Sequence, residues 1–207
     1  EANAICDSIK TEIKINKGAF KDFAVLYRTN AQSRMLEQTM MREGLPYNIV
    51  GGTKFYDRKE VKDVLAYLTL VCNPNDNIAL KRIINFPVRG IGEKSIKIFN
   101  DLALEKGISL FDSLKSCRDI KLRGKQQDSI ENFYLSINKF HDLLDTLDCK
   151  ELLRTLLEEF NIENYYKNNP AEQDRYNNIQ ELKLSIDRFA EKSNGSLKEF
   201  LQEISLY

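Results

Sequence analysis

The cysteines of this sequence are too widely scattered to form a metal site or a disulfide framework. Four cysteines stand alone, with no CxxC pair and only one histidine, His141, to join them. This spacing fits neither a zinc site nor a disulfide framework, so it predicts reduced thiols, no metal ligands and a cytoplasmic protein. No apolar run approaches the roughly 18 residues that cross a membrane, and no secretory signal pattern is present, so we expect no membrane partner.

The chain also has no formal net charge that would indicate a function. The 207 residues include 31 basic and 31 acidic side chains, so composition gives no reason to predict nucleic-acid binding. Any attraction to DNA must come from local clusters and backbone geometry. The phosphate-loop pattern GxxxxGK[ST] is absent, which excludes a self-contained ATPase site of that type.

Apolar patterning in the first half predicts a mixed α/β, predominantly helical protein. Residues 23–27 and 47–50 are short apolar runs on either side of an amphipathic segment at 31–43, and Gly44 stands at the C-terminal cap position of that segment. This order predicts a strand, a helix and a second strand, as in an α/β lobe.

From about residue 121 onward the strand signal disappears. Apolar residues recur at three- and four-residue steps, and Ser196 with Glu199 forms a capping box before the last predicted helix. We therefore expect an α/β segment over 1–120 and an all-helical segment over 121–207. The chain begins with Glu1 rather than methionine, and both of its ends are interpreted as cuts within a longer protein.

The first candidate site lies at the end of the predicted strand over 23–27. Tyr27 and Arg28 would stand at the carboxyl edge of a buried parallel strand, where α/β proteins bind ligands. A guanidinium there could stabilise charge during phosphoryl transfer, and the tyrosine could stack on a base. The alternative is an ordinary strand end with a surface arginine, and the residues alone favour that alternative.

The second candidate site is the segment GGTKFYDRKEVKD at residues 51–63. Lys54, Phe55 and Arg58 are the candidate DNA contacts. Basic side chains interleaved with aromatic ones suit single-stranded nucleic acid, which offers phosphates and exposed base faces. The alternative is a loop followed by a helix N-terminus, and the residues do not decide between the two.

The third candidate site is a turn between two predicted helices with the pattern glycine, apolar residue, glycine. Its residues, with the polar ones that follow, are Arg89, Gly90, Ile91, Gly92, Lys94 and Ser95. This pattern is typical of a helix-hairpin-helix turn, whose glycines let the backbone approach a phosphate at the next helix N-terminus. A simple glycine turn is the alternative, and the residues favour contact with a DNA backbone.

A weaker copy of this turn precedes the long helix predicted at 129–147. It consists of Arg123, Gly124 and Lys125. The same two interpretations apply, and here the residues slightly favour the simple turn. The three residues nevertheless remain candidate DNA contacts.

Taken in order, these stretches closely resemble the UvrD/PcrA/Rep family of superfamily-1 DNA helicases. Residues 23–34 (FAVLYRTNAQSR) resemble helicase motif IV, and residues 47–68 (YNIVGGTKFYDRKEVKDVLAYL) resemble the block that follows it. Residues 73–92 continue the match, and residues 175–206 are similar to the end of the family's helical insertion. The resemblance covers the whole chain, is tightest over 20–100, and is closest to the PcrA branch.

The resemblance implies a partial RecA-like lobe of the second motor domain over 1–120 and the helical insertion domain over 121–207. It implies an ATP-dependent, 3′-to-5′ DNA helicase of repair and replication in the bacterial cytoplasm, associated with the nucleoid. Tyr27 and Arg28 would reach the nucleotide, with Arg28 as the catalytic charge stabiliser. ATP and Mg²⁺ would be cofactors of the full-length protein only, so the fragment alone is expected to be inactive.

The implied partners are single-stranded and duplex DNA, the remaining helicase domains, and repair or replication proteins. A helicase–nuclease subunit of the AddA/RecB type is the alternative within the class. Two alternatives from other classes stay open, namely a stand-alone helix-hairpin-helix DNA-binding module and a protein-docking domain. The stand-alone module predicts a complete, self-closed fold, whereas an orphaned half-sheet with exposed apolar strand edges would favour a fragment.

Overall fold

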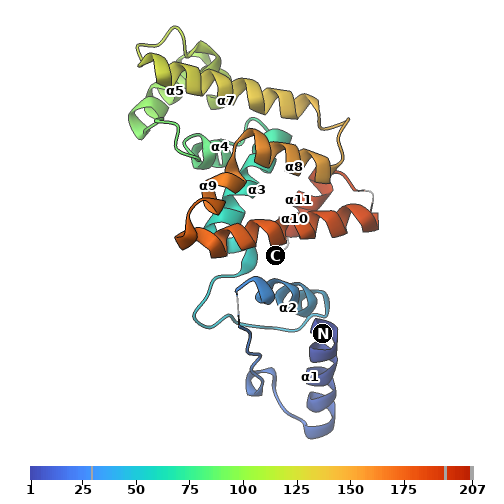
Figure 1. Ribbon diagram of the computed structural model, residues 1–207. Helices are drawn as coiled ribbons and strands as arrows, with labels where there is room; N and C mark the ends of the chain where they lie inside the picture. The colour runs from blue at the N-terminus through green and yellow to red at the C-terminus, as the bar shows by residue number, and fades with distance from the viewer. Residues whose placement is uncertain (29, 194, 206–207) are drawn as a thin grey trace.

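The computed structural model describes residues 1–28, 30–193 and 195–205, which are predominantly helical (Figure 1). The helices are α1 (Ala2–Asn16), α2 (Asn30–Arg42), α3 (Lys59–Cys72), α4 (Asn77–Ile83), α5 (Glu93–Lys106), α6 (Leu110–Ser113), α7 (Gly124–Asp142), α8 (Cys149–Glu159), α9 (Ile162–Lys167), α10 (Gln173–Ser193) and α11 (Leu197–Ser205). Figure 1 shows an elongated molecule with α1 and α2 at one end and α5 and α7 at the other.

Capping residues fix where several of these helices begin and end. The Asp76 carboxylate accepts hydrogen bonds from two backbone N–H groups in the first turn of α4. Ser109 accepts a hydrogen bond from the Asp112 N–H at 3.0 Å and starts α6. Gly44 follows α2 in a left-handed conformation with φ of 66°. The helix predicted over 31–43 and its glycine cap are therefore confirmed.

The two predicted strands are absent from the described residues, and this part of the fold prediction is corrected. Residues 23–27 and 47–50 pair with no neighbouring strand. Leu26 is 94% exposed and Val50 is 95% exposed, although both belong to runs predicted to be buried. A parallel strand is stable only when neighbouring strands satisfy its backbone groups and helices cover both faces. The described residues provide no such sheet, so both apolar runs remain unpaired.

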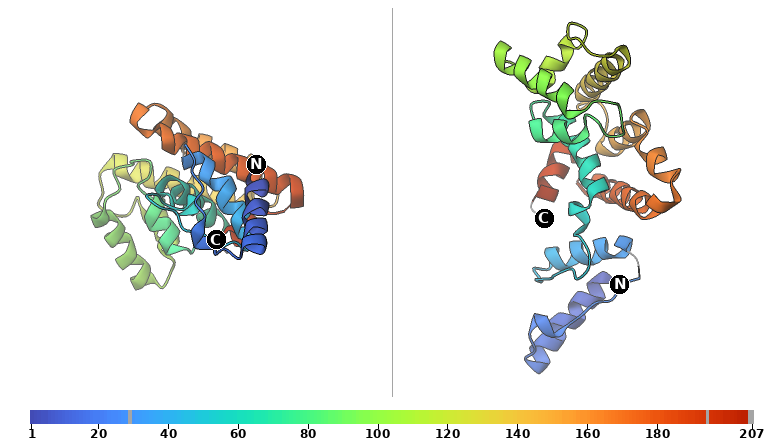
Figure 2. Two further views of the ribbon diagram at one scale, coloured as in Figure 1. Left: turned by 90° about the horizontal axis from the view of Figure 1, so that it is seen from below. Right: turned by 90° about the vertical axis from the view of Figure 1, so that its left-hand side faces the viewer.

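The hydrophobic core is built around α3. Val64, Tyr67, Leu68 and Val71 are completely buried along this helix. Helices α4, α7, α10 and α11 pack against it, and Figures 1 and 2 show α3 in the middle of the helical body. Because α3 is apolar on several sides, it can bury surface against helices from widely separated parts of the chain.

The core continues across the domain boundary that was expected near residue 120. Leu114 and Cys117 before that point and Ile130 and Phe133 after it belong to one cluster of buried residues. The segments 1–120 and 121–207 therefore share one hydrophobic core. The division into two domains stays a prediction.

Helices α1 and α2 form a smaller unit beside this core. The Cys6 side chain is buried in α1, and burial raises the pKa of its thiol. Lys10 Nζ lies 2.8 Å from Glu43 Oε2, and Arg42 Nη2 donates a hydrogen bond to Asn3 Oδ1 at 2.5 Å. These contacts hold the first helix against the end of α2.

The cysteine thiols are unlinked, and the histidine is hydrogen-bonded to the backbone of another helix. All four cysteines are free thiols, and His141 places Nδ1 2.7 Å from the carbonyl oxygen of Val71 near the end of α3. No group of three or more histidine, cysteine, aspartate or glutamate side chains in the described ranges is placed to hold a metal ion. Within those ranges, no helix has both the length and the apolar character needed to cross a membrane.

We expect Phe140→Ala to lower the free energy of unfolding by about 3–5 kcal/mol, because it opens a cavity in the core. Phe140 is completely buried on α7. Leu135→Ala on the same helix is the matched control, since Leu135 is 58% exposed, and it should change stability by less than about 0.5 kcal/mol. Urea denaturation followed by circular dichroism measures both. Equal effects of the two substitutions would contradict this assignment of the core.

Candidate nucleic-acid interface

One asparagine accepts two backbone hydrogen bonds from the turn between α4 and α5. Asn85 Oδ1 accepts hydrogen bonds from the backbone N–H groups of Arg89 and Ile91 at 2.9 and 3.0 Å. Ile91 is buried in the core, while Gly90 has a φ of 74° that favours glycine. The turn is thus anchored by an apolar side chain on its inner side and exposes the glycines on its outer side.

Arg89 has a structural position below this turn. Its Nη1 donates hydrogen bonds to the carbonyl oxygens of Ile83 at 2.9 Å and Phe86 at 2.7 Å. Its guanidinium carbon lies 5.1 Å from the ring centre of Phe133 and 5.3 Å from that of Phe160. The charge therefore satisfies carbonyl groups at the end of α4 and packs on aromatic rings. The guanidinium that was predicted to contact DNA is half-buried and hydrogen-bonded to other residues of this chain.

Lys94 and Ser95 lie in the first turn of α5 with different exposures. Lys94 is exposed, whereas Ser95 is buried. Gly92 precedes them as the N-cap residue of α5 and is also exposed. Of the predicted contacts around this turn, Gly90, Gly92 and Lys94 are the ones placed to meet a ligand at the surface, while Ile91 and Ser95 are inside.

The second turn, at the start of α7, lies against the first. Arg123 is the N-cap residue of α7, and Arg123, Gly124 and Lys125 are all exposed. Gln126 Nε2 donates a hydrogen bond to the Gly90 carbonyl oxygen at 2.6 Å. The structure thus brings together two candidate turns that sequence analysis treated as separate, and Gln126 is a residue that it did not single out.

The segment 51–63 places two of its three candidate contacts in the interior. Phe55 is 1% exposed and Arg58 is 8% exposed. Arg58 Nη1 donates to Asn178 Oδ1 and Nη2 donates to Ser33 Oγ, both at 2.7 Å. Lys54, by contrast, is exposed, with Nζ 5.7 Å from the ring centre of Tyr47. The side chains of Phe55 and Arg58 are therefore not available to a strand at the surface in this structure, whereas the third candidate contact, Lys54, is exposed.

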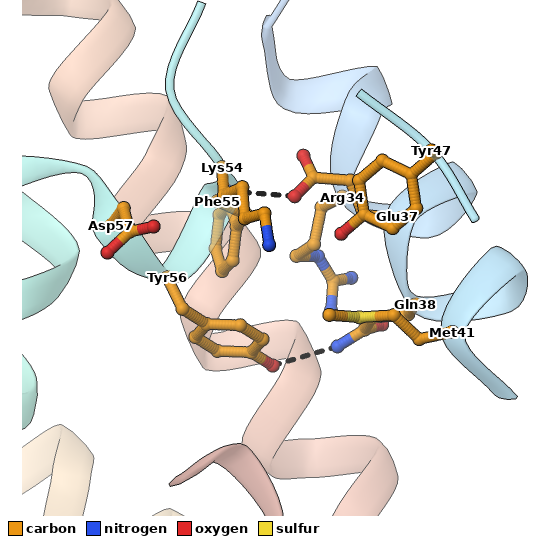
Figure 3. Close-up of a pocket in the computed structure, with 9 residues that line it drawn as sticks. All are labelled: Arg34, Glu37, Gln38, Met41, Tyr47, Lys54, Phe55, Tyr56 and Asp57. Carbon is orange, nitrogen blue, oxygen red and sulfur yellow. Dashed lines mark hydrogen bonds between the residues drawn. The ribbon is translucent and has the colours of Figure 1, made fainter. Parts of the chain in front are cut away.

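Aromatic and charged residues of this segment line a small pocket together with residues of α2. Figure 3 shows Arg34 and Glu37 from α2 facing Phe55 and Tyr56. The Phe55 N–H donates to Glu37 Oε2 at 3.0 Å, and Arg34 lies 5.6 Å from the ring centre of Phe55. The pocket volume is about 40 Å³, which suits a few water molecules and not a nucleotide.

Buried arginines connect this pocket to α10, and sequence analysis missed their role. Arg34 has no exposed surface, and its Nε donates to Glu181 Oε2 at 3.1 Å. Burial lowers the pKa of Arg34, and the Glu181 carboxylate opposes that shift. The only sequence signal is a polar residue on the inner face of a predicted helix, and nothing local indicates a partner 147 positions away.

Tyr27 and Arg28 lie on the surface directly before α2. Tyr27 is 37% exposed and Arg28 is exposed. The Arg28 N–H donates to Gln32 Oε1 at 2.9 Å, while Thr29, the next residue of the motif, lies outside the described residues. Both side chains are free to meet another domain, and the described residues do not enclose a nucleotide around them.

Comparison with known proteins gives a match over the whole chain. The family model of the UvrD-like helicase C-terminal domain matches residues 1–207. The chain is 39% identical over 193 residues to the ATP-dependent DNA helicase PcrA of Bacillus subtilis, covering 92% of this chain and 26% of that protein. It is 39% identical over 204 residues to PcrA of Staphylococcus aureus, covering 92% of this chain and 27% of that protein. The chain thus spans about a quarter of the length of these relatives.

We expect Arg89→Met to lower the free energy of unfolding by about 2–3 kcal/mol, because the carbonyl oxygens of Ile83 and Phe86 lose a charged donor. Lys94→Met is the control, since it replaces a nearby exposed cation by the same residue. Its effect should stay within about 0.5 kcal/mol. Chemical denaturation measures both, and a wild-type unfolding curve for Arg89→Met would show that the guanidinium is not structural.

Proposed function

This chain belongs to the UvrD-like helicase C-terminal domain family, and from that premise we propose that it is part of an ATP-dependent DNA helicase or translocase. It would contribute DNA contacts and nucleotide-sensing residues, without the ATP-hydrolysis centre. The proposal is supported by relatives named as ATP-dependent DNA helicases. The 3′-to-5′ polarity and the role in repair and replication at the nucleoid rest on the family resemblance.

The observation that carries the DNA-binding proposal is the glycine at position 92. Its φ of −92° and ψ of 175° are open to any residue, and an added Cβ would meet no atom within 4 Å. Neither the backbone conformation nor packing inside the described structure requires glycine there. A missing side chain at an exposed turn leaves room for close approach by a phosphate, with Lys94 beside it.

We therefore keep as proposed DNA contacts only those predicted residues that are exposed at the surface. Lys54, Lys94, Arg123 and Lys125 would supply positive charge, and the glycines of the two turns would supply backbone access. The buried or internally bonded Phe55, Arg58, Arg89, Ile91 and Ser95 would hold the turns and the segment in shape. Their proposed role is thus support and not contact.

For the nucleotide, we propose that Tyr27 and Arg28 act on ATP bound by another part of the full-length protein. The described residues do not form a binding site for ATP and Mg²⁺ on their own. The sequence has no phosphate loop, and the described acidic side chains form no metal-binding group. Arg28 would add one positive charge near the phosphates. The fragment alone would then neither hydrolyse ATP nor unwind DNA.

The exposed apolar runs support the proposal that residues 1–120 contribute to a RecA-like motor domain. Leu26 and Val50 would be buried if the runs that contain them joined a sheet with strands from elsewhere in the full-length protein. A stand-alone helix-hairpin-helix module would have no reason to expose such runs. Residues 121–207 would then form the helical insertion domain, with the remaining helicase domains as partners in cis.

We expect the Gly92→Asp/Lys94→Glu double variant to bind a 3′-tailed DNA duplex more weakly than wild type, because it adds negative charge at the turn. Fluorescence anisotropy at several salt concentrations measures the affinity. The slope of log affinity against log salt should fall by about 1 for each phosphate that the variant no longer binds. Ser8→Asp/Lys14→Glu on α1 has the same formal charge change at the other end of the molecule (Figure 1) and is the control. Equal weakening by both double variants would count against a site at the turn.

In the full-length protein that contains this segment, we expect Arg28→Ala to lower the rate of DNA-stimulated ATP hydrolysis by about 10³-fold, as for other arginine fingers. DNA affinity should be unchanged, because Arg28 would act on the nucleotide. Lys21→Ala is the control, since Lys21 is another exposed cation of the same region. A normal hydrolysis rate in Arg28→Ala would remove the proposed catalytic role.

A further inference from the structure

We propose that Arg58 is a positioning residue for Tyr27 and Arg28, and that it holds them by tying the start of α2 to Asn178 on α10. This inference rests on the proposed function, because it assumes that Arg28 acts on ATP bound elsewhere in the full-length protein. It adds a buried residue that raises the rate of hydrolysis without touching the nucleotide.

The first step is the attachment of Arg28 to the start of α2. Gln32 lies in the first turn of α2, and its side-chain oxygen Oε1 accepts a hydrogen bond from the Arg28 N–H at 2.9 Å. Ser33 follows Gln32 and is 2% exposed. A shift of the first turn of α2 therefore displaces the Arg28 backbone, so the contacts that hold Ser33 also place Arg28.

The second step is the bridge that Arg58 makes between two helices. Its Nη2 donates to Ser33 Oγ on α2 and its Nη1 donates to Asn178 Oδ1 on α10. The guanidinium carbon lies 5.3 Å from the ring centre of Phe55, and Arg58 is the N-cap residue of α3. A planar guanidinium that is bonded at both ends and stacked on a ring has little freedom to move. Arg58 thus fixes the start of α2 relative to α3 and α10.

The two partners of Arg58 are themselves held by buried carboxylates. Ser33 Oγ donates to Glu37 Oε1 at 2.7 Å, and Glu37 Oε2 accepts a hydrogen bond from the backbone of Phe55 (Figure 3). Asn178 Nδ2 donates to Glu60 Oε1 at 2.5 Å. Glu37 and Glu60 are both buried. A continuous set of buried hydrogen bonds therefore runs from α2 through Arg58 to α10.

Arg58 is also within electrostatic reach of Tyr27. Burial lowers the pKa of Arg58, whereas the carboxylates of Glu37 and Glu60 and the hydroxyl of Tyr27 raise it. The guanidinium that is bonded to the start of α2 thus interacts with one of the two residues that it positions and is linked through α2 to the other.

Stability alone does not account for a charged residue at this place. A well-packed apolar side chain would fill the same interior without the cost of desolvating a charge. It could not, however, donate to α2 and α10 at the same time. The rate of phosphoryl transfer depends on such positioning, because a displacement of about 1 Å can cost on the order of 10²-fold. The contacts of Arg58 should therefore be visible in the hydrolysis rate of the full-length protein.

The experiment measures kcat for DNA-stimulated ATP hydrolysis by the full-length protein. We expect Arg58→Met to lower kcat by about 10²-fold. In an Arg28→Ala background it should have no further effect, because a positioning residue acts only through the group that it places. Arg82→Met is the matched control, since Arg82 Nε donates to the buried Asp63 carboxylate at 2.8 Å on α3 and not to α2. It should lower stability and leave kcat unchanged.

Asn178→Ala tests the α10 end of the bridge and serves if Arg58→Met does not fold. It removes the acceptor of Arg58 Nη1, and we expect kcat to fall by about tenfold, which corresponds to the loss of one hydrogen bond. Again, no further loss should appear in the Arg28→Ala background. Asn177→Ala is the control, because Asn177 is exposed and accepts a hydrogen bond from Gln173 within α10. Urea unfolding curves show which variants are folded.

The outcomes separate this inference from the proposal on which it rests. If Arg28→Ala is slow but folded Arg58→Met and Asn178→Ala have wild-type kcat, the positioning role is overturned and the role of Arg28 stands. If Arg58→Met lowers kcat by the same factor with and without Arg28, it acts on the fold as a whole, which also overturns the positioning role. If Arg28→Ala hydrolyses ATP normally, the proposed function of Arg28 itself fails, and this inference fails with it.

Discussion

The guanidinium of Arg89 lies where several helices of the body meet. It donates hydrogen bonds to carbonyl oxygens at the end of α4, and to the hydroxyl of Tyr67 on α3. It also lies against the rings of Phe133 on α7 and Phe160 after α8. Burial raises the pKa of Tyr67 to about 12, and Arg89 opposes that shift, so Tyr67 stays a neutral donor and acceptor. One side chain thus fixes the end of α4, and with it the turn that starts α5.

A second set of buried charges organises the connection between α2 and α10. Arg34 and Arg58 are both buried, and each reaches a polar partner on α10, Glu181 and Asn178 respectively. Buried charges carry a large desolvation cost, and they are tolerated when hydrogen bonds satisfy them in a fixed geometry. Such a contact stabilises less than an apolar one of the same volume, and its hydrogen bonds are made in one geometry of the two helices.

Much of the helical structure could be predicted from local patterns. The capping boxes at Ser109 and Ser196 and the glycine after α2 mark helix ends correctly, because capping depends on residues a few positions apart. The long helix predicted at 129–147 instead spans Gly124–Asp142. Its apolar stripe indicates the face that is buried and not where the helix stops.

Roles that depend on distant partners could not be predicted. Aromatic and basic residues interleaved at 51–63 suit both a strand-binding loop and an interior stack of cations on Phe55. The choice depends on α2 and α10, far away in the sequence. The same holds for Arg89, whose partners come from four separate segments, and for Gln126, whose acceptor is a backbone carbonyl with no sequence signature. Strand formation at 23–27 likewise depends on neighbouring strands and not on the run itself.

The unpaired apolar runs around Leu26 and Val50 also affect how the isolated chain behaves in concentrated solution. An apolar segment with unsatisfied backbone N–H and C=O groups can pair with the same segment of another molecule. The two runs lie beside the α1–α2 unit, at the opposite end from the turns that precede α5 and α7 (Figure 1). Self-association through them would therefore join molecules at that end and leave the Gly-Ile-Gly turn of each copy facing outward.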